Sequence, residues 1–300
     1  MQSEPEQHFF DASSARLAYV TWGAADADPL LLIHATGFHG RVWDRTVAHL
    51  AGPYRVIAPD MRGHGLSSRP GPVMSWREPA GDLAELADAL GLDGAVGVGH
   101  SMGGHCLVQL AAGKPERFRH LVLFDPVILD PADYETGLRH LDGIESPSAH
   151  PVARRRNDWA KWEEMAARFR SRHPYSLWRP EVLEDYCRHG VRPKPEGGGF
   201  ELACPPEIEA SVYMSHASVD IYDEVAAVTA PVTVVRARER GPDDADRMDF
   251  AISPTWPGLA GCFANGRDIH RPDLTHFIPM QDPAFTARVI DEAARDAAAA

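Results

Sequence analysis

The segment that most constrains the fold of this chain is a pentapeptide centred on a serine, Gly99-His100-Ser101-Met102-Gly103. It follows a small apolar run at 95–98 and precedes a predicted helix at 102–112, which gives a strand, a sharp turn and a helix with the serine at the apex. The central residue of such a turn has a sparsely allowed backbone conformation, and the two glycines prevent a collision between strand and helix. The pattern predicts a serine hydroxyl raised above the end of a sheet.

Apolar runs elsewhere in the first half of the chain alternate with helical patterns. Residues 30–33, 55–58 and 120–124 are short and mostly apolar, as is typical of parallel strands covered on both faces. Between them, the segment 83–90 carries leucines at helical spacing. The chain is therefore predicted to be an α/β protein with a doubly wound, mostly parallel sheet flanked by helices and opened by a hairpin at 8–22.

The alternation stops between residues 127 and 228, and this segment is predicted to be a mostly helical cap inserted into the core. The core itself is assigned to residues 1–126 and 229–300. The sheet resumes at 231–235, a last strand is predicted at 261–263, and a closing helix contains Phe285, Val289 and Ile290.

Two features of the predicted cap have both a structural and a functional interpretation. Trp159, Trp162 and Phe169 form an aromatic stripe that either packs the cap on the core or lines an apolar pocket. The run of three arginines at 154–156 could recognise a substrate carboxylate, but a solvated helix face is the favoured interpretation.

Composition limits the classes of partner. A chain of 300 residues with 44% hydrophobic content can bury one large core, and its net charge of −13 argues against binding to nucleic acid. No segment is apolar enough for a membrane span and no secretory leader is visible, so we expect a cytoplasmic protein. No metal or other cofactor is expected. The cysteines lack metal-ligand spacing and the acidic run at 243–249 lacks that of a calcium loop; the cysteines are Cys106, Cys187, Cys204 and Cys262.

Five segments in this order resemble the α/β-hydrolase family, and in particular its serine hydrolases that carry a cap. Chance agreement of all five at predicted strand ends is negligible. The resemblance spans the chain apart from the cap, and it rests on Leu31-Leu32-Ile33-His34-Ala35-Thr36-Gly37-Phe38, on 56–67 with the sequence VIAPDMRGHGLS, on Gly99-His100-Ser101-Met102-Gly103-Gly104, on Leu121-Val122-Leu123-Phe124-Asp125-Pro126 and on Leu274-Thr275-His276-Phe277.

The resemblance implies roles for four residues. Ser101 would be the nucleophile, and His276, in the loop before the last helix, would be its base, with His270 as the nearest rival. The backbone N–H groups of Met102 and Thr36 would form the oxyanion hole.

The acid that orients the histidine departs from the usual position. The family commonly has an aspartate in the loop after the strand at 231–235, where this chain has the arginine-rich run 236–240. An arginine cannot hold the imidazole in its working tautomer, because it has no acceptor. Some family members use an acid at the end of the strand after the nucleophile, which here is Asp125. We favour Asp125 over three alternatives, Glu239, Asp243 and Asp244.

The resemblance implies a serine hydrolase that cleaves a small carboxylic ester, including a lactone or thioester, through an acyl-enzyme. An alternative within enzymes is hydrolysis of a carbon–carbon bond in a diketone from a ring-cleavage pathway. A third hypothesis, favoured only by the displaced acid, is a non-catalytic ligand receptor on the same fold.

Overall fold

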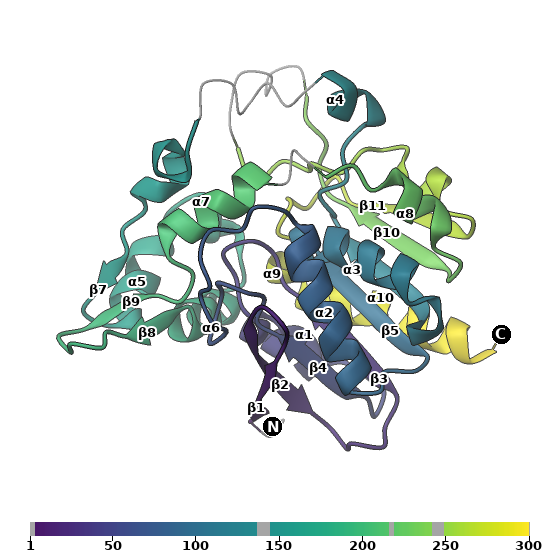
Figure 1. Ribbon diagram of the computed structural model, residues 1–300, viewed down its shortest axis with the longest axis horizontal. Coiled ribbons are helices and arrows are strands. Elements are labelled where there is room, and N and C mark those ends of the chain that lie inside the picture. Colours follow the sequence, from purple (N-terminus) through teal and green to yellow (C-terminus); the bar gives the residue numbers. More distant parts are fainter. Residues whose placement is uncertain (1–3, 137–144, 216–218, 242–248, 300) are drawn as a thin grey trace.

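The computed structural model describes residues 4–136, 145–215, 219–241 and 249–299, and its centre is an eight-stranded sheet (Figure 1). The order across the sheet is β1-β2-β4-β3-β5-β6-β10-β11. The pairs β1/β2 and β2/β4 are antiparallel and all later pairs are parallel, which confirms the predicted fold class and opening hairpin. The strands are β1 (Glu6–Asp11), β2 (Arg16–Trp22), β3 (Pro29–Ile33), β4 (Arg55–Pro59), β5 (Ala95–His100), β6 (Phe118–Phe124), β10 (Val232–Arg236) and β11 (Gly266–His270).

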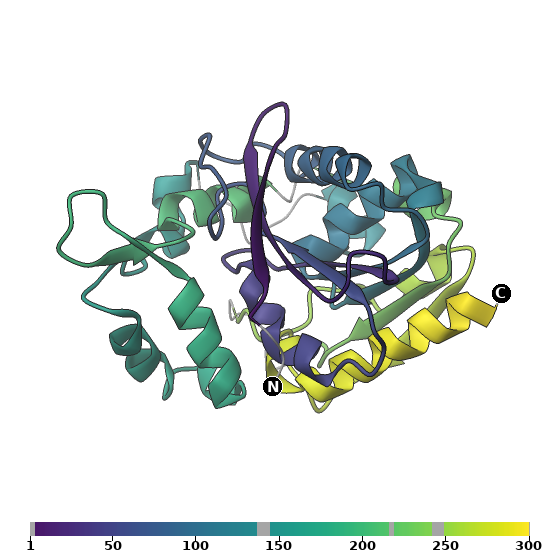
Figure 2. The same cartoon turned by 90° about the horizontal axis from the view of Figure 1, so that it is seen from below.

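Helices cover both faces of the sheet because successive strand residues point to opposite sides. In β3, Leu30 and Leu32 face one apolar layer with α1 (Asp44–His49) and α10 (Pro283–Ala299). Leu31 and Ile33 face the other layer, which holds α2, α3 and α8. Figure 2 shows α10 along one side of the sheet, with α2 and α3 on the opposite side. Helices α2, α3 and α8 span Arg77–Ala89, Met102–Gly113 and Tyr222–Ala227, respectively.

The described part of the predicted cap contains helices, and residues 145–215, here called the cap segment, extend away from the sheet at the left of Figure 1. They also form a small antiparallel sheet, in the order β7-β9-β8, that the sequence did not predict. The elements from 127 to 215 are α4 (Pro131–Thr136), β7 (Asp158–Trp159), α5 (Trp162–Phe169), α6 (Pro180–His189), β8 (Val191–Pro193), β9 (Phe200–Leu202) and α7 (Pro206–Ser215), with short 3-10 turns at Pro147–Ala149, Pro151–Arg154 and Tyr175–Leu177.

Two details of the predicted cap differ in the structure. Trp159 lies in β7 rather than on the helix that carries Trp162 and Phe169, although its ring still meets that of Phe169 at a centroid distance of 5.8 Å. Helix α8, inside the predicted range 127–228, packs in the core layer with α3. The division of the chain into core and cap domains stays a prediction.

The prediction of a last strand at 261–263 is wrong. Gly261 and Cys262 end a 3-10 helix (Leu259–Cys262), and Phe263 follows it directly. The apolar side chains of this helix pack against the core. The last strand is β11, at the edge of the sheet, and most of its residues are exposed. Its sequence, GRDIH, lacks an apolar run because an edge strand here buries little surface, so periodicity gave no signal.

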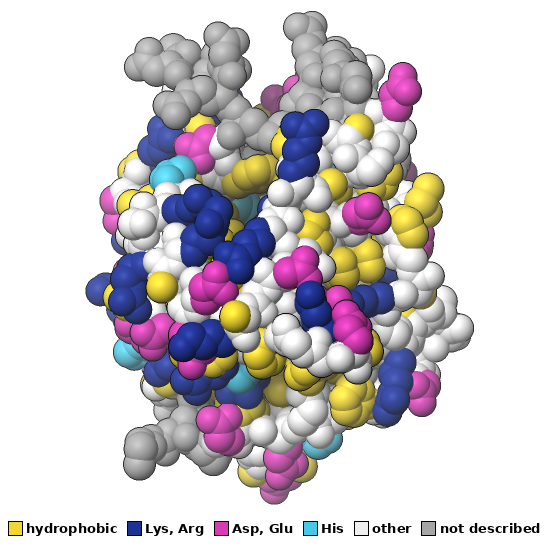
Figure 3. Space-filling view, turned by 90° about the vertical axis from the view of Figure 1, so that its left-hand side faces the viewer, with side chains coloured by type: hydrophobic (Ala, Val, Ile, Leu, Met, Phe, Trp, Pro, Cys, Tyr) yellow, Lys and Arg dark blue, Asp and Glu magenta, His cyan; other side chains and the backbone are white. Residues whose placement is uncertain are grey.

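Charge is divided unevenly along the chain. The cap segment contains 11 basic and 11 acidic residues, which leaves 19 basic and 32 acidic residues elsewhere. Figure 3 shows lysine and arginine side chains gathered on the face of the molecule that this segment forms, with acidic side chains among them. The face is therefore balanced rather than a cationic surface of the kind that binds polyanions. Among the described helices, none has the length and apolarity that a membrane crossing requires.

Candidate active site

Ser101 lies at the junction of β5 and α3, as predicted. Its backbone has φ 58° and ψ −120°, a conformation that non-glycine residues rarely adopt. A Cβ on Gly99 would lie 2.6 Å from the carbonyl oxygen of Gly103, and one on Gly103 would lie 2.4 Å from that of Ile33. The turn therefore requires both glycines because backbone atoms occupy the space of any side chain.

Three of the residues singled out in the sequence come together at the carboxyl ends of neighbouring strands. His276 Nε2 lies 3.0 Å from Ser101 Oγ, and His276 Nδ1 lies 2.7 Å from Asp125 Oδ2. Asp125 follows β6, and His276 lies in the loop between β11 and α9 (Ile278–Gln281). The exposed fractions are 6% for Ser101, 8% for His276 and 0% for Asp125, so the serine and the histidine retain slight access to water and the aspartate has none.

Two further hydrogen bonds hold the buried carboxyl group of Asp125. Its Oδ1 accepts hydrogen bonds from the Ala237 backbone N–H at 3.0 Å and from Ser253 Oγ at 2.6 Å. Both donors compensate the buried negative charge and leave Oδ2 for His276. The sequence analysis missed Ser253, which no motif identifies because it lies 128 positions from Asp125.

The described alternatives, Glu239 as the acid and His270 as the base, make contacts elsewhere. Glu239 forms an ion pair with Arg236, and His270 lies 3.7 Å from the same carboxylate. Arg236 also pairs with Asp268 at 2.8 Å, so the arginine near the family's usual acid position holds two carboxylates at the sheet edge. Two further candidates, Asp243 and Asp244, lie outside the described residues.

Two further hydrogen bonds hold the backbone of the histidine loop. His276 N–H donates to the Ala251 carbonyl at 2.8 Å, and His100 Nε2 lies 2.8 Å from the His276 carbonyl. Burial lowers the pKa of His100 to about 3, so its ring is neutral at pH 7 and donates from Nε2. The neighbour of the serine thus fixes the position of the predicted base.

The predicted oxyanion donors come from two different segments, the start of α3 and the loop after β3. Met102 is the first residue of α3, so its N–H has no carbonyl partner one turn earlier in the helix. Thr36 follows β3, in a loop where Gly37 N–H donates to His64 Nε2 at 2.9 Å. Burial lowers the pKa of His64 to about 4, which keeps Nε2 free of a proton and able to accept this bond. Both N–H groups therefore belong to rigid backbone.

The turn after β4 has a structural role. The two carboxylate oxygens of Asp60 accept backbone N–H groups, from Gly40 at 2.6 Å and from Leu66 at 2.7 Å. Met61 N–H donates to His34 Nε2 at 3.0 Å, which joins this turn to the loop that carries Thr36. These bonds position the site and reach none of its reacting atoms.

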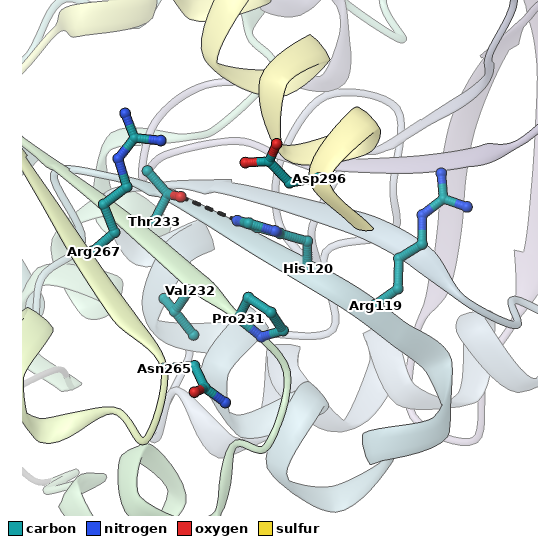
Figure 4. Close-up of a pocket in the computed structure, with 8 residues that line it drawn as sticks. All are labelled: Arg119, His120, Pro231, Val232, Thr233, Asn265, Arg267 and Asp296. Carbon is teal, nitrogen blue, oxygen red and sulfur yellow. Dashed lines mark hydrogen bonds between the residues drawn. The ribbon is translucent and has the colours of Figure 1, made fainter. Parts of the chain in front are cut away.

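Two cavities differ in their relation to this site. One, of about 360 Å³, lies at the opposite ends of the strands and contains none of the predicted site residues; its lining includes Arg119, His120, Arg267 and Asp296 (Figure 4). Figure 4 shows the hydrogen bond between the His120 ring and Thr233. The other, of about 100 Å³, borders Thr36 and Phe277 and reaches Arg155 and Glu209 in the cap segment. Ligands of open α/β sheets bind at the carboxyl ends of the strands, which favours the second cavity.

The interpretation of Arg154–Arg156 as a solvated face is wrong for its middle member. Arg154 and Arg156 are exposed, but Arg155 turns inward, pairs with the buried Glu209 and lines the smaller cavity. No periodicity could reveal this, because Glu209 lies 54 positions away.

Comparison with known proteins gives relatives in both sequence and structure. A family model described as alpha/beta hydrolase fold matches residues 28–145. The chain is 38% identical over 273 residues to Lipase LipV of Mycobacterium tuberculosis, which covers 90% of this chain and 94% of that protein. It is 38% identical over 108 residues to Esterase YbfF of Escherichia coli, covering 35% and 40% of the two chains. The solved structure of E-2-(acetamidomethylene)succinate hydrolase superposes with a TM-score of 0.75 at 20% identity, covering 97% of this chain and 100% of the other, and so reports on the fold alone.

Proposed function

This chain belongs to the α/β-hydrolase fold family and is a hydrolase, and we propose that it cleaves carboxylic esters with Ser101, His276 and Asp125. The observation that carries the proposal is the continuous hydrogen-bonded path from Ser101 Oγ through both ring nitrogens of His276 to Asp125. Nucleophile, base and orienting acid each sit within hydrogen-bond reach of the next, as acyl transfer requires.

In the first half of the reaction, Ser101 Oγ attacks the carbonyl carbon while His276 Nε2 takes the hydroxyl proton. Asp125 accepts a hydrogen bond from His276 Nδ1–H, holds the ring in that tautomer and stabilises the imidazolium. His276 then gives the proton to the departing alcohol, which leaves an acyl group on Ser101. In the second half, water attacks the acyl carbon and gives a proton to His276 Nε2. The bond from that carbon to Ser101 Oγ then breaks, His276 returns the proton to Ser101 Oγ, and the acid is released.

The oxyanion of each tetrahedral intermediate would be stabilised by the N–H groups of Met102 and Thr36. Met102 opens a helix of 12 residues, whose N-terminal dipole favours negative charge. Thr36 Oγ1 donates to Met102 Sδ at 3.6 Å, so the hydroxyl is turned toward its neighbour, leaving the backbone N–H as the donor of this residue.

Ester hydrolysis is favoured over the other chemistries by the names of relatives, which include a lipase, an esterase and a 3-oxoadipate enol-lactonase. The receptor hypothesis rested on the missing acid in the usual loop. Asp125 now stands 2.7 Å from His276, which removes that argument.

The test is turnover of p-nitrophenyl acetate and butyrate by the wild type and by Ser101→Ala. We expect kcat/KM to fall by about 10⁴-fold or more in the variant, with an unchanged circular dichroism spectrum. Retained turnover would contradict the assignment of the nucleophile. A wild type that cleaves a vinylogous diketone acid but no ester would instead favour carbon–carbon bond hydrolysis.

A further inference from the structure

The smaller cavity borders the proposed reaction centre and contains an ion pair. On one side it is lined by Thr36, the proposed oxyanion donor, and by Phe277, which follows His276. On the other side it is lined by Arg155 and Glu209 of the cap segment. A group attached to an ester carbonyl held at Thr36 would therefore enter this cavity.

The ion pair leaves one acceptor unused. Arg155 Nη1 donates to Glu209 Oε2, and Arg155 Nη2 donates to the hydroxyl oxygens of Tyr186 at 3.3 Å and Tyr175 at 3.5 Å. Within the part of the chain that the structure describes, Glu209 Oε1 receives no hydrogen bond, although the side chain is only 5% exposed. This oxygen is not sealed from solvent, and Glu209 lines the cavity, so a hydroxyl group of a ligand in the cavity can donate a hydrogen bond to it.

The position of this oxygen is fixed by the active-site loop. Glu209 Oε1 lies 2.6 Å from the point that a Cβ on Gly37 would occupy, and Gly37 has φ +78°. Tyr186 donates to the Gly37 carbonyl at 3.4 Å. Glu209 Oε1 therefore lies next to Gly37, the residue that follows the proposed oxyanion donor Thr36. A short substituent on an ester carbonyl held at Thr36 would reach this oxygen.

The walls and the volume restrict what fits. Phe38, Trp178 and Phe277 surround the cavity, with ring centroids 5.5 Å apart for Phe38 and Trp178 and 5.2 Å apart for Trp178 and Phe277. Such walls suit the carbon atoms of a ligand. The volume of about 100 Å³ is well below the roughly 300–1,000 Å³ of ordinary ligand pockets. Only a short chain can enter.

The charges favour a neutral ligand. Arg155 is already neutralised by Glu209, so a second carboxylate would bring an unpaired negative charge into a site shielded from water. A hydroxyl group would instead donate to Glu209 Oε1 without adding charge. This reverses the idea that an arginine here recognises a substrate carboxylate.

We propose that this cavity is a substrate subsite for a short, uncharged arm of the ester that carries a hydroxyl group donating to Glu209. The proposal rests on the proposed ester hydrolase function and adds the class of substrate. Thr36 marks the position of the ester carbonyl. The aromatic rings contact the carbon atoms of the arm, and Glu209 of the ion pair accepts a hydrogen bond from its hydroxyl group.

Two isosteric pairs of esters test the subsite, one varied in the acyl chain and one in the alcohol. The first is methyl 3-hydroxybutyrate against methyl 3-methylbutanoate, and the second is 3-hydroxybutyl acetate against 3-methylbutyl acetate. Each hydroxylated ester is assayed as separate enantiomers by titration of the released acid. In at least one pair we expect kcat/KM to be about 10-fold higher for the hydroxylated ester, the size of a hydrogen bond to a charged group. Monomethyl succinate should be hydrolysed at least about 100-fold more slowly than methyl butyrate.

The variant Glu209→Gln tests the ion pair, and Glu207→Gln, an exposed glutamate on the same helix, is its control. Removing the charge of Glu209 leaves Arg155 unpaired, so the ratio of kcat/KM for monomethyl succinate to that for methyl butyrate should rise about 10-fold or more. Glu207→Gln should leave this ratio unchanged. A loss of stability alone would lower both rates together and leave the ratio as it was.

Equal turnover of the isosteres in both pairs, within about twofold, would overturn the subsite while the ester hydrolase function stands. The same holds if wild type accepts monomethyl succinate as readily as methyl butyrate. These wild-type comparisons decide the proposal even if Glu209→Gln does not fold. A protein that hydrolyses no ester, p-nitrophenyl acetate included, would overturn the proposed function and the subsite with it.

Discussion

The candidate active site and the cavity above it are built in different ways. Ser101 and Asp125 directly follow strands of the parallel sheet, and His276 lies in a loop held by backbone hydrogen bonds. The cavity's polar end is made instead by side chains from separate parts of the cap segment, Arg155 and Glu209 among them. If the proposals above hold, the sheet supplies a rigid, general chemistry and the cap segment supplies the choice of substrate.

The largest effect is expected for the acid behind the histidine. Asp125→Asn keeps the shape of the side chain but offers the wrong partner to His276 Nδ1, so kcat/KM for p-nitrophenyl acetate should fall by about 10⁴-fold. Glu239→Gln is the control, because that carboxylate pairs with Arg236 at the sheet edge and should change the rate by less than about twofold. Equal losses in the two variants would place the acid elsewhere.

Backbone crowding at the serine turn should be the next largest effect. A Cβ on Gly103 would meet the backbone oxygens of Ile33 and His34 at 2.4 and 2.6 Å, so Gly103→Ala should cost about 3 kcal/mol or more in the free energy of unfolding. Gly113→Ala, at the end of the same helix with no atom within 4 Å of the new Cβ, should change it by less than about 1 kcal/mol. Urea unfolding measures both, and equal stability of the two variants would show that the turn is not rigid.

As the pH is lowered, the free energy of unfolding should fall before exposed carboxylates become protonated. Burial lowers the pKa of His39 and His100 to about 3 and that of His64 to about 4, whereas an unfolded histidine has a pKa of about 6.5. Below pH 6.5 the unfolded state therefore binds protons that the folded state does not, and stability falls as the pH falls from about 6.5 to 4.

Within that window, each of these three histidines lowers the free energy of unfolding by about 1.4 kcal/mol for each unit by which the pH falls. Asp60 opposes one of them, because burial raises its pKa to about 6 and the folded state gains a proton earlier than the unfolded state. The net slope from these four groups is about 3 kcal/mol per pH unit between pH 6 and 4. Urea unfolding at pH 7.5, 6 and 5 checks it, and a stability that does not change with pH would refute neutral buried histidines.

The smallest effect compares one hydroxyl in each region. Ser253→Ala removes a donor to the buried Asp125 at 2.6 Å, and we expect about 2 kcal/mol of destabilisation and about a 10-fold lower kcat. Tyr175→Phe removes a hydroxyl 3.5 Å from Arg155 and should cost less than about 1 kcal/mol. A larger loss for Tyr175→Phe than for Ser253→Ala would contradict the idea that the active site is the more rigidly built of the two regions.

The same contrast explains what could be predicted from the sequence. Ser101 and the glycines of the turn are marked by a local pattern, because a sharp turn needs particular residues at fixed spacing. Asp125 was favoured over three other acids only through the resemblance to a family. The last strand, β11, carried no such pattern because it is an exposed edge. Arg155 looked like part of a solvated run, since its partner Glu209 and its tyrosine neighbours are brought to it only by tertiary packing.

The most direct test of the central claim is covalent labelling of the nucleophile by a fluorophosphonate. A serine activated by His276 and Asp125 should form one phosphonyl adduct, and peptide mass spectrometry should place it on Ser101. Ser101→Ala should remain unlabelled, and Asp125→Asn should be labelled far more slowly than wild type. An unmodified wild-type protein, or an adduct on any other residue, would contradict the account.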